Sequence, residues 1–348
     1  MHLEAAEHGH SHSRSSSVSS SSGILHAAFR RVKGHDACHQ WSGAACCMQN
    51  SGGVVKLLNH AGRAVLQLGD HRLDVEVASD GRFGPDPQGV FTDWCAFTAW
   101  ASTHRGGCHR PEALVTLDPA LLGAPVPRPP QVFAVGLNYR SHAEETNLAP
   151  ATVMPLTFTK FPSAITGPYT DLELTGDTVD WEIELVAVIG RAGFRIPAER
   201  AWEHVAGLTV GQDFSDRTVQ MTGSPPQFSL GKSFPGFAPL GPALVTTQEL
   251  ADPDRLALRC TVNGEPVQTG STVEMIHPVA DLVSMLSRIC ALGPGDVIFT
   301  GTPEGVGMGR KPPRYLRPGD LVVSEIEGLG RIEQRCVEQG GARTGADT

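Results

Sequence analysis

Residues 180–190 read Asp-Trp-Glu-Ile-Glu-Leu-Val-Ala-Val-Ile-Gly, and their second half is an uninterrupted apolar run. Such a run, rich in β-branched residues, predicts a buried strand, here over 182–190. Glu182 and Glu184 stand two residues apart at the start of the run. Because alternate side chains of a strand point to the same face, both carboxylates are expected on one face of a sheet.

The two glutamates can be interpreted in two ways. Charged residues alternate along the wet face of many sheets, so a solvated strand face is the ordinary explanation of an isolated Glu-x-Glu pair. The alternative is a divalent cation that neutralises the two like charges, because Mg²⁺ and Mn²⁺ prefer carboxylate oxygens and water as ligands. The pair by itself favours the solvated face.

A third carboxylate favours the metal instead. Residues 207–220 read Gly-Leu-Thr-Val-Gly-Gln-Asp-Phe-Ser-Asp-Arg-Thr-Val-Gln, so a predicted strand at 207–210 runs directly into a polar cluster. The end of that strand would deliver Asp213 as a third ligand. Glu182, Glu184 and Asp213 are therefore the candidate metal ligands, with Mg²⁺ or Mn²⁺ as the expected ion and Ca²⁺ as an alternative.

Outside this stretch, short apolar runs alternate with turns that contain glycine or proline. One segment, 279–290, has the helical period, because its apolar residues recur on one face of a helix. Since few helices separate many strands, the sequence predicts a β-rich α+β fold rather than a doubly wound parallel sheet. The strands predicted here cover 132–136, 182–190, 207–210, 256–263, 296–300 and 320–326.

The sequence divides into regions of different composition. Residues 125–130, Pro-Val-Pro-Arg-Pro-Pro, predict a stiff extended linker, because each proline fixes its own φ and disfavours helix in the residue before it. We expect a small N-terminal β-rich domain at 54–124, a catalytic domain at 131–338 and a flexible tail at 339–348. Within the small domain, strands are expected at 54–58, 64–68 and 73–77, and a helix at 93–101.

Residues 1–53 are rich in histidine and serine and cannot bury enough apolar surface to order themselves. We expect a disordered extension or a misassigned start of the protein. A group of histidines and cysteines superficially suggests zinc, but its spacing fits no zinc-binding pattern, so the disordered extension is preferred. This group comprises His35, Cys38, His39, Cys46 and Cys47.

Composition argues against several classes of partner. The net charge of −9 does not fit a nucleic-acid-binding surface, which needs clustered lysine and arginine. No apolar run reaches the roughly 18 residues of a membrane helix, so no membrane partner is expected. The eight cysteines are irregularly spaced and no signal peptide is evident, so we expect reduced thiols and a cytoplasmic protein.

A series of motifs from residue 132 onward resembles the fumarylacetoacetate hydrolase family. The pattern D-x-E-x-E-L at 180–185 is followed by G-x-T-x-x-Q-D-x-S-x-R-x-x-Q at 207–220, in which Gln212 replaces the family's usual asparagine. Each motif alone is weak, but together they stand in the family's order. The others are Gly-Leu-Asn-Tyr-Arg-Ser-His-Ala-Glu-Glu at 136–145, Lys-Phe-Pro-Ser-Ala-Ile-Thr-Gly-Pro at 160–168, Gly-Lys-Ser-Phe at 231–234, Gly-Pro at 241–242 and Gly-Thr-Pro-Glu-Gly-Val-Gly at 301–307.

The resemblance implies a domain built on a rolled, mixed β-sheet, with a metal in a deep cleft that binds a small 2-oxo acid. It also implies a homodimer. The animal enzyme has a fourth acidic ligand where Val135 and Gly136 stand here, so the chain is similar to the smaller bacterial type with three carboxylates.

The resemblance also implies roles for individual side chains. His142 and Glu145, three residues apart, would activate water, although a His-x-x-Glu pair alone is more often a surface hydrogen bond. Lys232 would stabilise a developing oxyanion, with a solvated lysine as the alternative. Candidate substrate contacts are Arg217 and Gln220 at the distal end, Thr302 at the carboxylate, and Tyr139 and Lys160, which would shape the cleft.

Some positions depart from the family pattern. Asp216 and Thr218 replace the alanine and aspartate that are common around the family arginine, and Pro235-Gly236 replaces a common Asp-Thr. These changes predict an unusual loop geometry close to the substrate.

Three functions fit these features. The first is hydrolysis of a carbon–carbon bond in a 1,3-diketo acid of the acylpyruvate or fumarylpyruvate type, because a water-activating pair is present. The second is isomerisation, hydration or decarboxylation of a 2-oxo diacid from aromatic-compound catabolism, of the 5-carboxymethyl-2-hydroxymuconate isomerase or oxaloacetate decarboxylase type, because the same metal would serve either reaction. The third is a non-catalytic protein that retains the fold.

Overall fold

The computed structural model describes residues 55–104, 110–145 and 154–340, which belong to one compact unit beginning at Gln49. The predicted extension at 1–53, with its histidines and cysteines, lies outside the described residues, as does most of the predicted tail. No helix in the described ranges is long and apolar enough to cross a membrane.

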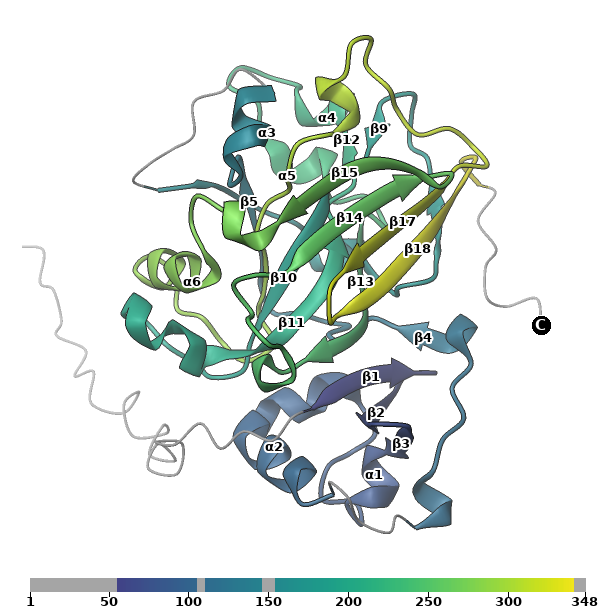
Figure 1. Cartoon of the computed structure of the whole chain (residues 1–348), viewed down its shortest axis with the longest axis vertical. Helices are drawn as coiled ribbons and strands as arrows, with labels where there is room; N and C mark the ends of the chain where they lie inside the picture. The colour runs from purple at the N-terminus through teal and green to yellow at the C-terminus, as the bar shows by residue number, and fades with distance from the viewer. Residues whose placement is uncertain (1–54, 105–109, 146–153, 341–348) are drawn as a thin grey trace, which may run out of the picture. The chain divides into compact units, whose positions relative to one another are not determined.

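The largest sheet is mixed and runs in the order β3-β2-β1-β13-β11-β10-β16-β5-β6. Figure 1 labels β1, β2, β3, β5, β10, β11 and β13 of this path. Along this path β16 and β5 are parallel and the other neighbours are antiparallel, while β4 joins β1 and β7 joins β13. The strands are β1 Lys56–His60, β2 Arg63–Leu68, β3 His71–Asp74, β4 Leu122–Gly123, β5 Val132–Gly136, β6 Leu156–Thr159, β7 Ile165–Thr166, β10 Ile183–Ile189, β11 Val205–Gln212, β13 Ala238–Val245 and β16 Val297–Phe299.

A second sheet runs in the order β15-β14-β17-β18-β8, and β9 pairs with β12. These strands are β8 Asp171–Glu173, β9 Val179–Asp180, β12 Ser215–Asp216, β14 Ala257–Val262, β15 Glu265–Ser271, β17 Leu321–Ile326 and β18 Gly330–Val337. The α-helices are α1 Val75–Ala78, α2 Trp94–Ser102, α3 Arg140–Glu145, α4 Arg217–Gln220, α5 Phe228–Gly231 and α6 Val279–Ser287. Short 3₁₀ helices cover Pro87–Asp93, Pro111–Ala113, Pro119–Leu121, Pro162–Ala164, Ala198–His204, Thr247–Glu249, Thr272–Glu274 and Gly307–Gly309.

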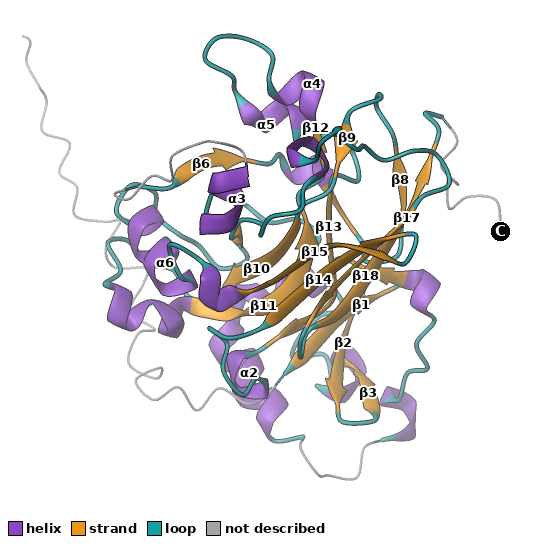
Figure 2. Cartoon of the chain, turned by 45° about the horizontal axis from the view of Figure 1, so that its top comes forward, coloured by secondary structure: helices purple, strands orange, loops and turns teal. Residues whose placement is uncertain are grey.

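Strand β10 is buried on both faces, which explains the continuous apolar sequence of residues 185–189. One face contributes Leu185 and Ala187 to a core shared with the second sheet. The other contributes Val186 and Val188 to a core shared with α2. The helices α3, α4 and α5 lie at one end of the large sheet (Figure 2). The charged residues at the start of β10 point to the same side as Val186, because they are an even number of residues from it.

The β-rich α+β prediction is confirmed, and most predicted elements fall within a residue or two of observed ones. The strand expected at 73–77 is wrong, because the chain turns into α1 at Val75. The Asp74 carboxylate accepts a hydrogen bond from the Val77 amide and caps this helix, which local apolar alternation does not reveal.

The N-terminal strands extend the large sheet, since β1 pairs with β13. The division of the chain at residues 125–130 therefore stays a prediction. Cys260, Cys290 and Cys336 are free, whereas Cys95 is disulfide-bonded, which contradicts the expectation of reduced thiols at this position.

Candidate metal centre

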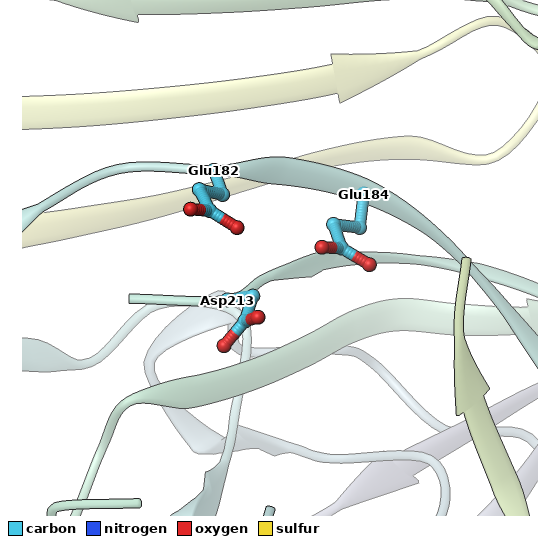
Figure 3. A group of neighbouring side chains, drawn as sticks. All are labelled: Glu182, Glu184 and Asp213. Carbon is cyan, nitrogen blue, oxygen red and sulfur yellow. The ribbon is translucent and has the colours of Figure 1, made fainter. Parts of the chain in front are cut away.

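Three buried carboxylates meet where β10 begins and β11 ends. Glu182 directly precedes β10, Glu184 is its second residue, and Asp213 directly follows β11. The antiparallel register sets Glu184 opposite Gly211, and the Asp213 amide donates to the Glu182 carbonyl at 2.9 Å. One oxygen of each carboxylate lies within 4.8 Å of the other two (Figure 3). The exposed fractions are 7% for Glu182, 1% for Glu184 and 0% for Asp213, so a solvated strand face is excluded.

The three carboxylates differ in electrostatic environment. Burial, together with the charges of Asp213 and Glu182, raises the pKa of Glu184 well above its usual value. Burial also opposes ionisation of Glu182, but the positive charges of Lys232 and Arg217 outweigh it and lower the pKa of Glu182 to about 2. Glu182 is thus stabilised as an anion, whereas Glu184 has too little positive charge around it to stabilise its ionised form.

Two lysines hold Asp213 from opposite oxygens. The Lys232 Nζ lies 2.7 Å from Asp213 Oδ2 and 2.9 Å from Glu182 Oε2, so it bridges two of the candidate ligands. The Lys160 Nζ lies 2.5 Å from Asp213 Oδ1 and also donates to the Lys232 carbonyl. Burial lowers the pKa of Lys160, although Asp213 partly offsets the effect. Lys160 is fully buried, and its ammonium group contacts the Asp213 carboxylate and the Lys232 backbone.

The chemistry of this donor set fits a hard divalent cation. All three candidate ligands are carboxylates, the ligand type that Mg²⁺, Mn²⁺ and Ca²⁺ share. An ionised carboxylate can accept about four hydrogen bonds or metal bonds, so the contacts with the lysines leave capacity for a metal. Moreover, the raised pKa of Glu184 identifies a position where further positive charge would be stabilising.

Arg217 contacts the carboxylate group directly. Its Nη1 lies 2.7 Å from Glu182 Oε1 and 2.9 Å from the Gln220 amide oxygen. Its Nε lies 2.8 Å from Asp180 Oδ2. Both Arg217 and Gln220 are buried, so a contact with the distal end of a substrate stays a prediction for each.

Asp180 was given no role on the basis of the sequence. It is fully buried and accepts hydrogen bonds from the amides of Gly307 at 2.7 Å and Met308 at 3.0 Å, in addition to its contact with Arg217. Its spacing from Glu182 and Glu184 was the available signal, because residues 180, 182 and 184 would share one face of a continuous strand. In the structure Asp180 ends β9 and Glu184 belongs to β10.

The predicted pair of His142 and Glu145 is close in space on α3. The His142 Nδ1 lies 3.3 Å from Glu145 Oε2, and His142 is buried. The Gly305 amide donates to both Glu145 carboxylate oxygens at 3.1 and 3.2 Å. His142 also contributes to the lowered pKa of Glu182, after Lys232 and Arg217, which indicates that the imidazole lies near the carboxylate group.

The remaining predicted substrate contacts, Thr302 and Tyr139, are both buried. The Thr302 hydroxyl donates to the Ile183 carbonyl at 2.7 Å and accepts from the Gln268 amide at 2.8 Å, so it ties residues 301–303 to β10. Among the described residues the Tyr139 hydroxyl has no hydrogen-bond partner, whereas buried hydroxyls are normally paired. Burial and the charge of Glu184 raise the pKa of Tyr139.

The contacts of Gln212 give a structural reason for its presence in place of the family's usual asparagine. Its amide oxygen accepts from the Glu182 amide at 2.8 Å, and its amide nitrogen donates to the Ser324 hydroxyl on β17 at 2.8 Å. Glutamine is one methylene longer than asparagine, and here it joins the start of β10 to the second sheet.

Asp216 and Thr218, the second departure from the family pattern, belong to one hydrogen-bonded group. The Asp216 carboxylate caps α4 and accepts from the hydroxyls of Thr175 and Thr178. The Thr218 hydroxyl in turn bonds to that of Thr178 at 2.9 Å. The two replacements therefore fix the turn at 175–178 against α4. Gly236, in the third departure, has a φ of +81°, a conformation that favours glycine.

Comparisons with known proteins agree with this geometry. The profile of the fumarylacetoacetate hydrolase C-terminal domain matches residues 131–337. A human protein, mitochondrial oxaloacetate tautomerase FAHD2A, is 49% identical over 216 residues, which are 62% of this chain and 68% of that protein.

Two solved structures are also similar. A putative HpcE protein from Mycobacterium smegmatis is 51% identical with a TM-score of 0.76, covering 81% of this chain and 99% of that one. Fumarylpyruvate hydrolase from Pseudomonas aeruginosa, solved with Mn²⁺ and pyruvate, is 37% identical with a TM-score of 0.55, covering 60% of this chain and 90% of that one.

Proposed function

The chain belongs to the fumarylacetoacetate hydrolase family and is an enzyme that acts on keto acids, and from this premise we propose that it interconverts the keto and enol forms of a 2-oxo dicarboxylic acid of the oxaloacetate type. The observation that carries the proposal is the buried carboxylate group with Lys232 and His142 beside it. The name of the human relative supports tautomerisation as the reaction.

We further propose that Glu182, Glu184 and Asp213 hold Mg²⁺ or Mn²⁺. Such a cation, when bound, supplies Lewis acidity that stabilises negative charge on the oxygens of a 2-oxo acid. The Pseudomonas enzyme was solved with Mn²⁺ and pyruvate, a 2-oxo acid, which supports a divalent cation here.

In the proposed reaction His142 moves the proton. Its Nδ1 faces Glu145, which orients the imidazole, and the ring serves as the base that takes a proton from the carbon next to the keto group. The electron pair of the broken C–H bond forms the C=C bond, and the keto oxygen gains the negative charge and then a proton. Lys232 stabilises this charge as an ammonium donor. Arg217, which Asp180 holds in place, adds a second positive charge.

Hydrolysis is a second candidate, which the proximity of His142 and Glu145 favours. In that reaction His142 takes a proton from water, and the resulting hydroxide attacks the distal carbonyl carbon of a 1,3-diketo acid. The carbon–carbon bond then breaks, and its electron pair leaves with the pyruvate fragment as an enolate that is subsequently protonated. The Pseudomonas hydrolase supports this alternative.

One experiment separates the two reactions. The purified protein with Mg²⁺ or Mn²⁺ is mixed with enol oxaloacetate and, separately, with acylpyruvates and fumarylpyruvate, and the ultraviolet absorbance is followed above the uncatalysed rate. Faster loss of the enol with every carbon retained supports tautomerisation, whereas release of pyruvate and an acid supports hydrolysis. If the wild-type protein converts none of these substrates faster than the Glu182→Gln variant does, both proposals are wrong.

A homodimer and a place in aromatic-compound catabolism are proposed from family membership alone. Size-exclusion chromatography with light scattering tests the first, and a monomer across the assay concentrations would refute it. The cytoplasmic location stays an expectation, and the human relative is named as mitochondrial.

A further inference from the structure

Glu145 is enclosed by one short segment, residues 305–309. The Gly305 amide donates to both carboxylate oxygens of Glu145. Gly309 packs against the same side chain so closely that a methyl group on Gly309 would lie 2.5 Å from Glu145 Cδ and 2.6 Å from its Cγ. Real side chains do not approach so closely, so any residue larger than glycine at 309 must displace something.

The three glycines of this segment differ in what surrounds them. A methyl group on Gly305 would lie 2.0 Å from the Val267 carbonyl oxygen, and one on Gly307 would lie 1.9 Å from the Arg314 carbonyl oxygen. Both neighbours are backbone atoms, and Gly305 also has a φ of +100°. At Gly309, in contrast, the three nearest atoms all belong to the flexible Glu145 side chain. Alanine at 309 is therefore expected to move Glu145 and to leave the fold intact.

The segment itself is anchored on its other side. The amides of Gly307 and Met308 donate to Asp180, and the Trp181 indole donates to the Gly305 carbonyl at 3.1 Å. The Arg310 guanidinium also lies over the Trp181 ring at 5.7 Å from its centre. These contacts fix residues 305–310 against the start of β10, so the segment cannot withdraw and Glu145 must give way.

We propose that Gly309 is a positioning residue: by leaving the space that the Glu145 side chain fills, it keeps the carboxylate against the Gly305 amide and the His142 Nδ1. The effect on turnover passes through His142, so the inference rests on the proposed function. The three atoms nearest to a methyl group on Gly309 all belong to Glu145 and none to a candidate metal ligand, so metal binding is expected to be independent of Gly309.

The test is a double-mutant cycle with four proteins: wild type, Gly309→Ala, Glu145→Ala and the double variant. Gly309→Ala is expected to lower kcat by at least about tenfold, since a well-placed general base contributes about 10²- to 10⁴-fold. Its Tm and its Kd for Mn²⁺ should stay close to the wild-type values. In the Glu145→Ala background the same substitution should change kcat by less than about twofold, because the displaced group is already absent.

Gly84→Ala is the matched control. Gly84 does not have a positive φ, and a methyl group there would have no atom within 4 Å. It should leave kcat, Tm and metal affinity unchanged. A second readout without turnover is the side-chain ¹H–¹⁵N spectrum of His142, which should shift in Gly309→Ala and in Glu145→Ala but not in Gly84→Ala.

The outcomes separate this inference from the proposed function. Wild-type turnover in Glu145→Ala would refute the role of the His142 and Glu145 pair. Impaired Glu145→Ala with fully active Gly309→Ala would overturn only the present inference. If Gly309→Ala fails to fold, recovery of folding in the double variant supports the contact with Glu145, and failure of both variants overturns it.

Discussion

Two ion-pair clusters of this protein have similar distances and opposite surroundings. In the N-terminal strands, Arg63 lies 2.6 Å from Asp74 and 2.8 Å from Glu76, with the arginine side chain 41% exposed. In the candidate metal centre, Lys232 lies 2.7 Å from Asp213 and 2.9 Å from Glu182, with the lysine side chain 3% exposed. Distance alone therefore does not distinguish an ordinary surface cluster from a functional one, and burial does.

The difference has an energetic meaning. Exposed ion pairs contribute about 0–1 kcal/mol to stability, because water competes for both partners. Buried pairs must first lose their hydration, and apolar residues of the same size are often as stable or more stable in their place. A buried cluster that includes three candidate metal ligands is therefore better explained by function than by stability, and this contrast can be tested in four ways.

The largest effect is expected for Asp213→Ala. It removes one of the three candidate ligands, so Mn²⁺ affinity measured by calorimetry should fall by more than about 100-fold, given that loss of residues that merely support ligands costs about 10- to 100-fold. Asp74→Ala, in the exposed cluster, is the control and should leave Mn²⁺ affinity unchanged. Equal affinities in the two variants would remove Asp213 from the metal site.

Lys160→Met should have an effect of comparable size, on stability rather than on metal affinity. It leaves the buried Asp213 without one of its two ammonium partners, and breaking a buried pair costs about 3–5 kcal/mol of unfolding free energy. Urea unfolding of the metal-free protein measures this cost. A loss below about 1 kcal/mol, as expected for an exposed pair, would contradict the contrast between the two clusters.

Metal affinity should also depend on pH. The pKa of Glu184 is raised by burial and by the neighbouring carboxylates, so the metal-free protein keeps a proton on Glu184 to higher pH than an ordinary glutamate does, and below that pKa a cation must displace it. Mn²⁺ affinity should therefore increase with pH, by up to about tenfold per unit while the pH is below that pKa, and then level off. Calorimetry in two buffers of different ionisation enthalpy detects the released proton, and a flat profile would contradict this assignment.

The smallest effect is expected for Arg63→Met in the exposed cluster. The Arg63 side chain is 41% exposed, although that of Asp74 is only 11% exposed, so water can solvate the guanidinium and the unfolding free energy should fall by less than about 1 kcal/mol and by still less in concentrated salt. Urea unfolding at low and high NaCl concentration checks both statements. A salt-independent loss of several kcal/mol would show that exposure does not separate the clusters.

Strands with strong local patterns could be predicted from the sequence. The run from 185 to 189 is apolar throughout because β10 is buried on both faces, and 132–136 matches β5. Strand β13 was missed because its middle residues, Gly241-Pro242, are typical of a turn, and its pairings with β11, β1 and β7 make it a strand. The start of α1 was missed for a comparable reason, since it depends on the Asp74 cap.

Some parts of the site could be predicted from local sequence patterns, and others depend on the folded structure. The spacing of Glu182 and Glu184 and the strand before Asp213 were sufficient to predict that these carboxylates meet. No local pattern shows that Lys160 lies beneath Asp213, since the two residues are 53 positions apart and only the folded sheet joins them. The Asp180 carboxylate likewise accepts hydrogen bonds from the amides of Gly307 and Met308, which are distant in sequence.

The pairing of β1 with β13 has a practical consequence for shortened forms of the protein. Residues 131–337 match the family profile, yet β13 is hydrogen-bonded to β1 at Leu244 and Val245. A chain beginning at 131 would turn this stretch into an open sheet edge and would uncover the apolar surface that Leu57 and Leu66 now cover. Open apolar edges associate with one another. Recombinant production of the matched region alone would therefore favour aggregates over a minimal enzyme.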